Sequence, residues 1–137
     1  MEVFRRVSVI LLLALAAAPV SLAAQETTRN LRVFFDCNAD CDDDYVRTET
    51  PWVNFVRDRT DADVHLLITS IGTGAGGQRY TLNFVGLGAF AGRNDTLSFV
   101  FNVGETDDVG RQGLTRTIQL GLAPYVARTP AASLVRM

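Results

Sequence analysis

Residues 72–77 constrain the fold most, because four of these six residues are glycine. So many glycines cost too much backbone entropy for a helix interior, and they readily adopt the positive φ values of tight turns. A short apolar run, residues 64–68, precedes them, and residues 79–87 follow with alternating apolar and polar side chains. Two strand-like runs around a glycine turn predict a β-hairpin. We therefore expect residues 61–87 to form the centre of a small mixed sheet.

The glycine turn does not have the context of a phosphate-binding loop. A dinucleotide-binding fingerprint needs a helix after its glycines, because the helix N-terminus holds the pyrophosphate. Here a strand-like run follows the glycines. The Walker pattern also needs a lysine, and the chain has none. We interpret GTGAGG as a flexible hairpin turn.

The first 24 residues have the pattern of a cleavable signal peptide. Arg5 and Arg6 precede a short run of Val, Ile, Leu and Ala, and Ser21 and Ala23 supply small side chains before a cleavage site near Ala23/Ala24. A basic head, an apolar core and a small-residue exit are typical of secreted proteins. An uncleaved membrane anchor is the alternative, but the apolar stretch is short for a full span. We expect a periplasmic or secreted protein with no stable membrane span after cleavage.

The charge balance argues against nucleic acid as a partner. The whole chain has 13 basic and 15 acidic residues, and the acidic excess grows when two arginines and one glutamate leave with the signal peptide. Nucleic-acid-binding domains usually carry a marked basic excess. We expect no nucleic-acid partner.

Both cysteines of the chain lie in one acidic segment, DCNADCDDD, residues 36–44. In an exported protein, two cysteines point first to a disulfide, here Cys37–Cys41. Free thiols are the main alternative. A redox-active pair would need a lowered thiol pKa, which neighbouring carboxylates oppose. A zinc site would need further ligands, and His65 is the only histidine.

The aspartates of the same segment suggest calcium as a weaker possibility, because Ca²⁺ takes six to eight oxygen ligands. The candidate ligands are Asp36, Asp40, Asp42 and Asp44. Their spacing is not that of an EF-hand, which also needs a glycine and a distal glutamate. A solvated turn whose last aspartate caps a helix explains them more simply. We favour the turn and expect no cofactor, with Ca²⁺ as the alternative.

The remaining patterns complete a single α+β domain over residues 31–129, a two-layer sandwich in which two helices pack on a mixed sheet of about four strands. The expected order is strand, helix, three strands, helix. Tyr45, Trp52, Phe55 and Val56 share one face at helical spacing, although Pro51 interrupts the pattern or starts the helix. We expect strands at 31–35 and 97–103, helices at 44–59 and about 107–127, and a disordered tail at 130–137.

This order of elements resembles the N-terminal domain of TolB and the related CsgG-type envelope domains. A closer resemblance is to an uncharacterised bacterial envelope family with segments similar to DCNADCDDDYVRTETPWVNFVRDRTDADVHLLIT, TGAGGQRYTLNFVGLGAFAG and GRQGLTRTIQLGLAPYVART. Longer members look as if they continue into an outer-membrane β-barrel-like region. The resemblance implies an envelope protein or such a barrel as partner, and it supplies no catalytic residues. The chain stops at Met137, which suggests a fragment, a truncated product or a free-standing version.

Three functions are compatible with the sequence. We rank first an exported, non-catalytic envelope module that binds another protein. A calcium-stabilised or disulfide-regulated periplasmic domain centred on residues 36–44 comes second. A small periplasmic enzyme comes third, using His65 or the carboxylates Asp36, Asp40 and Glu49, but a histidine inside a strand is more often structural than catalytic.

Overall fold

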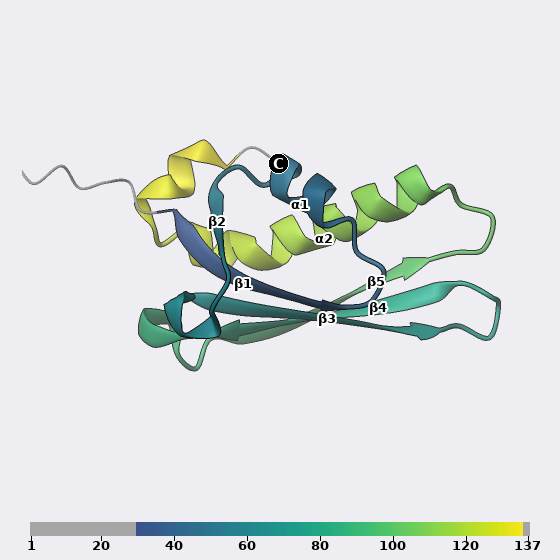
Figure 1. Cartoon of the computed structure of the whole chain (residues 1–137), viewed down its shortest axis with the longest axis horizontal. Helices are drawn as coiled ribbons and strands as arrows, with labels where there is room; N and C mark the ends of the chain where they lie inside the picture. The colour runs from purple at the N-terminus through teal and green to yellow at the C-terminus, as the bar shows by residue number, and fades with distance from the viewer. Residues whose placement is uncertain (1–29, 136–137) are drawn as a thin grey trace, which may run out of the picture.

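The computed structural model describes residues 30–135 (Figure 1). The predicted signal peptide, residues 1–24, lies outside the described residues. The described part contains five strands, two α-helices and three short 3-10 helices: β1 (Leu31–Asn38), α1 (Asp43–Glu49), β2 (Val53–Val56), η1 (Arg59–Asp61), β3 (Val64–Gly72), β4 (Gln78–Gly86), η2 (Gly88–Phe90), β5 (Asn94–Phe101), α2 (Asp107–Val126) and η3 (Pro130–Leu134).

The five strands form one mixed sheet in the order β2-β1-β3-β4-β5. Strand β1 runs parallel to both of its neighbours, whereas β3, β4 and β5 form an antiparallel meander. The predicted α+β class is confirmed, with five strands in place of about four. In the described residues, no helix is long and apolar enough to cross a membrane.

The predicted hairpin around the glycine turn is confirmed. Strands β3 and β4 pair along their whole length, from Val64 opposite Gly86 to Gly72 opposite Gln78. Gly76 has a φ of 85°, a value that only glycine adopts readily. Gly77 lies against the backbone of β5, where an added Cβ would overlap the carbonyl of Phe101. The turn therefore needs glycine for its conformation at one position and for close packing at the next.

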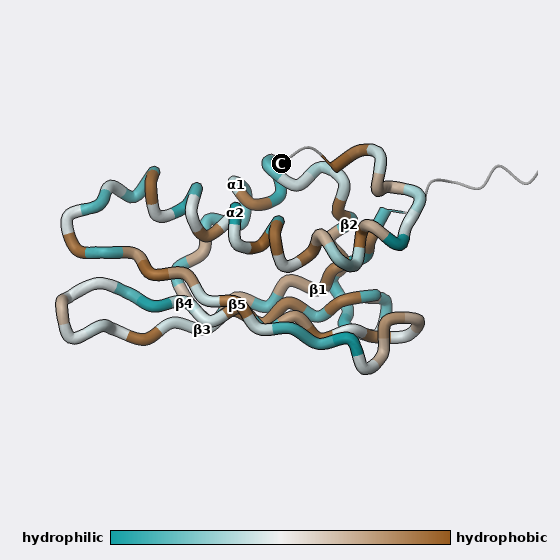
Figure 2. Tube along the Cα trace, turned by 180° about the vertical axis from the view of Figure 1, so that it is seen from behind, coloured by the Kyte–Doolittle hydropathy of each residue, from teal (hydrophilic) through white to brown (hydrophobic). Residues whose placement is uncertain are grey.

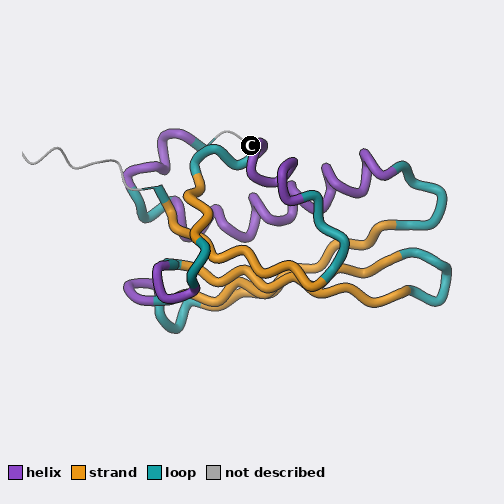
Figure 3. The backbone as a smooth tube through the Cα atoms, in the orientation of Figure 1, coloured by secondary structure: helices purple, strands orange, loops and turns teal. Residues whose placement is uncertain are grey.

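Both α-helices cover the same face of the sheet, and no α-helix of residues 30–135 covers the other face (Figures 1 and 3). Alternate residues of β3 and β4 point toward the helices and are mostly buried, whereas the residues between them are more exposed. Figure 2 shows that apolar and polar segments are interspersed along the strands. The buried core joins side chains from the strands and from α2: Leu31, Val33, Leu66, Ile68, Leu82, Phe84, Leu114, Ile118 and Leu122.

Helix α2 lies close to the sheet because it turns glycines toward aromatic rings. An added Cβ at Gly121 would overlap the ring of Phe84, and one at Gly113 would overlap the ring of Phe99. The predicted helix at 107–127 is confirmed, and Thr106 caps its N-terminus by accepting a hydrogen bond from the Val109 N–H (3.4 Å).

The predicted helix at 44–59 is wrong after Glu49. Helix α1 ends at Glu49, and the chain turns at Pro51 and enters β2. Proline cannot donate the backbone hydrogen bond that a continuing helix needs. Val53 instead pairs in parallel with Leu31 on β1. The helical spacing of the apolar residues was therefore overridden by pairing with a strand that is distant in the sequence.

The two ends of the second half also differ from the prediction. The last strand is Asn94–Phe101, a few residues earlier than expected. Residues 130–137, for which the sequence predicts a disordered tail, include the 3-10 helix η3. The tail prediction is corrected there, because Ala131 is fully buried in the core and Val135 packs against it.

Candidate functional site

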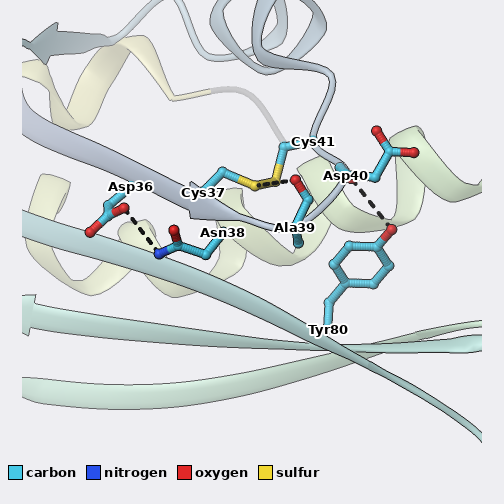
Figure 4. The surroundings of a disulfide bond; sticks show 7 residues. All are labelled: Asp36, Cys37, Asn38, Ala39, Asp40, Cys41 and Tyr80. Atoms are coloured by element: carbon cyan, nitrogen blue, oxygen red, sulfur yellow. Dashed lines mark hydrogen bonds between the residues drawn. A yellow bond between two sulfur atoms is a disulfide. The ribbon is translucent and has the colours of Figure 1, made fainter.

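The predicted disulfide between Cys37 and Cys41 is confirmed (Figure 4). Cys37 lies near the end of β1, and Cys41 lies just before α1, with their Cα atoms 6.4 Å apart. Both cysteines pack against the edge of the hydrophobic core. The bond therefore fixes the sharp connection by which the chain leaves the sheet for the helix layer.

Removal of this disulfide is expected to destabilise the domain only moderately. Replacing Cys37 and Cys41 together by alanine should lower the free energy of unfolding by about 2 kcal/mol or less, because so short a loop loses little entropy on closure. Urea unfolding with and without reductant would measure the change. Reductant should shift the wild-type midpoint and leave the double variant unchanged; a shift in both would show that reductant acts elsewhere.

The four aspartates proposed as calcium ligands have separate surroundings. Asp36 accepts a hydrogen bond from Asn38 (3.2 Å) and contacts His65, whereas Asp44 is exposed in the first turn of α1. Asp42 caps α1 by accepting a hydrogen bond from the Tyr45 N–H (3.0 Å), as in the simpler interpretation, although it is not the last aspartate of the segment. Within residues 30–135 there is no group of three or more His, Cys, Asp or Glu residues that could hold a metal ion.

Arg111 on α2 ties the acidic segment to the helix layer. Its guanidinium contacts Asp108 (2.6 Å) and Asp42 (3.6 Å), and it lies 4.9 Å from the centre of the Tyr45 ring. The hydrogen bond that Arg111 donates to Asp108 is the main reason why the pKa of Arg111 is raised further, so its guanidinium stays charged. Asp42 is thereby engaged in a cap and an ion pair.

A hollow of about 230 Å³ lies beside this segment. It is lined by polar and apolar side chains from β4, β5, α2 and the disulfide loop: Asp40, Asp42, Tyr80, Phe101, Asp107, Gly110, Arg111 and Leu114. The Tyr80 hydroxyl donates a hydrogen bond to the Asp40 carbonyl (3.3 Å; Figure 4). Its pKa is raised above 10.0, mainly because the phenol is buried and also because Asp40 is near.

Alkaline solution is expected to destabilise the domain through Tyr80 and Tyr125. Burial raises the pKa of Tyr125 as well, and its hydroxyl donates to the Arg93 carbonyl (2.7 Å). The two tyrosine hydroxyls lose their protons near pH 10 in the unfolded chain, and at a higher pH in the folded chain. The stabilisation that comes from these buried neutral hydroxyls is therefore complete below about pH 10, and it is lost as the pH rises through the folded pKa values. Urea unfolding between about pH 8 and pH 11 should show this decline. The double variant Tyr80→Phe/Tyr125→Phe should show a shallower decline; an equal slope would contradict the assignment.

On the other face of the sheet, His65 lies between Asp36 and Arg59. The Arg59 Nε–H donates to His65 Nδ1 (3.1 Å), and His65 Nε2 lies 3.1 Å from an Asp36 carboxylate oxygen. Because Nδ1 accepts a hydrogen bond, the neutral ring carries its proton on Nε2 and donates it to Asp36. The Phe34 ring lies beside the imidazole, 5.2 Å between centroids. Both ring nitrogens are therefore engaged.

The structure unites only some of the residues considered for catalysis. Asp36 and His65 meet because β1 and β3 pair in parallel with Phe34 opposite His65. Asp40 lines the hollow near the disulfide, and Glu49 ends α1, where its carbonyl accepts a hydrogen bond from Gln119 (2.9 Å). Sequence reasoning missed Arg59 as a partner of His65, since that contact depends on the placement of η1 after β2.

The face of the sheet that carries His65 also exposes apolar side chains. We call it the bare face and define it by residues from the four longer strands: Phe34, Asp36, His65, Leu67, Thr69, Ile71, Arg79, Thr81, Asn83, Val85, Thr96, Ser98 and Val100. Phe34, Leu67 and Val85 are half-buried, whereas Ile71 is 66% exposed and Val100 is 38% exposed. These exposed apolar side chains lie on one row of the sheet, on either side of Arg79.

Comparisons of the chain with protein-family models, with curated proteins and with solved structures find no match.

Proposed function

We propose that this chain is an exported, non-catalytic module of the cell envelope that binds another envelope polypeptide through its bare face. The observation that carries the proposal is the asymmetry of the sheet, with both helices on one face and exposed Ile71 and Val100 on the other. Exposed apolar side chains grouped on a flat surface are typical of protein-binding sites. Their polar surroundings, which include Thr81 and Arg79, resemble the rim of such an interface.

The arrangement of His65 supports a binding role over an enzymatic one. A general base needs a free nitrogen within reach of a substrate proton. Nδ1 of His65 accepts from Arg59 and Nε2 faces Asp36, so the imidazole has a structural role in holding η1 and β1 against β3. Export is supported by the signal-like N-terminal sequence and by the disulfide, since such bonds persist in oxidising compartments. The resemblance to TolB-type and CsgG-type domains extends the proposal to an envelope partner.

Site-specific photo-crosslinking in intact cells tests this function. A photoreactive amino acid at Ile71 or at Thr81 should yield one adduct whose second component is an envelope protein. The matched control is Arg116, which is exposed on α2 in the helix layer. Equal adducts from Arg116, or no adduct from either position on the bare face, would contradict the proposal.

A further inference from the structure

We infer that the free edge of β5 and the adjoining side of α2 form a self-association surface, and that its occupant is a second copy of this chain. This edge surface consists of Thr96, Ser98, Val100, Val109, Gly113, Thr117, Leu120 and Pro124. Its strand residues Thr96, Ser98 and Val100 also belong to the bare face, but the pairing uses their backbone groups and leaves the side chains of that face uncovered. The inference therefore stands or falls independently of the proposed function.

Strand β5 is an edge strand without the usual protection. It is last in the sheet and pairs only with β4 among the described residues. It is eight residues long, and from Thr96 to Phe101 it contains no charged residue and no proline. Natural proteins normally protect such an edge with charges, prolines, bulges or a short strand. The opposite edge follows this rule, since β2 has only four residues.

The backbone of β5 has hydrogen-bonding groups directed toward that free edge. The Gly86 N–H donates to the Arg93 carbonyl (3.0 Å), which sets the alternation of bonds between β4 and β5. In an antiparallel pair, every second residue bonds its neighbour and the residues between them point away. The odd-numbered residues of β5 therefore bond β4. Thr96, Ser98 and Val100 direct their backbone N–H and C=O groups outward.

The side of α2 above this edge is mostly uncharged, and Arg116 lies at its border with the side that faces α1. Arg111 and Gln119 contact α1 and its end, and Leu114 and Ile118 face the core. A helix turns about 100° per residue, so the side away from α1 carries Val109, Gly113, Thr117, Leu120 and Pro124. Gly113 lies on the ring of Phe99, which places this side over β5. Val109 is 48% exposed and Leu120 is 53% exposed.

One two-fold axis satisfies both the strand and the helix. We place β5 antiparallel to the β5 of the second copy, with Ser98 opposite Ser98. In this register the helix-facing side chains of both copies lie on the same face of the joined sheet, and Leu97 of one copy lies opposite Phe99 of the other. Gly110 lies over Phe101 and Gly113 over Phe99, so the part of α2 just after Gly113 lies near Ser98. Val109 and Leu120 are nearly equidistant in sequence from that point. The same axis therefore brings Val109 of one copy next to Leu120 of the other.

The expected distance between the two copies of α2 also agrees with a dimer of this kind. Paired strands lie about 4.8 Å apart. Helix α2 packs on rings from both β4 (Phe84) and β5 (Phe99), so its axis lies about one strand spacing from the two-fold axis. The two copies of α2 would then be about 10 Å apart, at the upper end of the usual distance between packed helices. The pair would share a continuous ten-stranded sheet, which removes the unprotected edge from each copy.

The mass of the purified protein in solution, measured by sedimentation over a range of concentrations, tests this inference. The wild type should reach twice the mass of one chain. Ser98→Pro should abolish the dimer, because proline removes the N–H at the two-fold axis, whereas Ser98→Ala should retain it. The Ser98 N–H points away from β4, so proline there is compatible with the folded monomer, and circular dichroism would check this.

A charge exchange between the helices provides the second measurement. Val109→Asp and Leu120→Lys should each raise the dissociation constant of the dimer by about tenfold. The double variant should recover much of the affinity, because the new carboxylate faces the new ammonium of the other copy. A monomeric wild type at high concentration would overturn the inference. A dimer unaffected by Ser98→Pro and by Leu120→Lys would overturn it as well, because such a dimer would use another surface.

Discussion

Replacing Gly121 by valine is expected to lower the free energy of unfolding by about 3 kcal/mol. Gly121 is buried on α2, and the three atoms nearest to an added Cβ all belong to the ring of Phe84. That ring is itself fully buried at the centre of the core and has no solvent-facing space to enter. A non-glycine residue has a higher helix propensity, but this gain offsets less than about 1 kcal/mol of the destabilisation that the overlap causes. Chemical denaturation followed by circular dichroism would measure the loss.

Two further variants show whether the overlap with Phe84 is the cause. Gly74→Ala is the control, because an added Cβ at Gly74 meets nothing within 4 Å and its φ is not positive. Its unfolding free energy should stay within about 0.5 kcal/mol of the wild type. In the combination of Gly121→Val with Phe84→Leu, the smaller side chain should restore part of the lost stability. If Gly121→Val has the same unfolding free energy as the wild type, that result would contradict the close approach of α2 to the sheet.

Replacing Trp52 by alanine is expected to cost about 3–5 kcal/mol of stability, the range for removing a large aromatic side chain from a core. Trp52 is only 2% exposed and belongs to the core cluster, although it lies in the turn between α1 and β2. Its removal leaves a cavity beneath both elements. It also weakens the attachment of β2, which has only β1 as a pairing partner among the described residues.

The measurement for Trp52→Ala is urea unfolding followed by far-ultraviolet circular dichroism, since the variant loses the chain's only tryptophan fluorophore. Val103→Ala is the matched control, because Val103 is 70% exposed and its truncation should change stability by less than about 0.5 kcal/mol. Equal losses in the two variants would show that Trp52 is not a core residue.

Local patterns predicted the antiparallel half of the fold and missed one strand of the parallel half. The β3–β4 hairpin is specified by neighbouring residues, because a glycine turn joins two strands that pair with each other. Strand β2 has no such local signal. Its four residues follow Pro51 and pair with β1, more than twenty residues earlier in the chain. The helical spacing of Tyr45, Trp52 and Phe55 was coincidental, and only the long-range pairing shows this.

The candidate site also has one part that the sequence could predict and another part that it could not. The disulfide could be predicted because the two cysteines are close in the sequence and because the signal-like N-terminal sequence predicts an oxidising compartment. The contact between His65 and Asp36 could not, because it depends on which residue of β1 lies beside His65. A shift of one residue in that register would turn one of the two side chains to the other face of the sheet. The edge surface likewise depends on where α2 crosses β5.

A ribosome releases the N-terminus first, so β1 is synthesised before either of the strands beside it. Its parallel partners begin at Val53 and Val64, whereas β3 and β4 each pair with the next strand to emerge. Contacts between distant residues form more slowly than local ones. We therefore expect the meander to close early and β1 to join it later. Until Tyr125 and the rest of α2 have emerged to cover the sheet, the apolar side of β1 remains available to a chaperone or to misfolding.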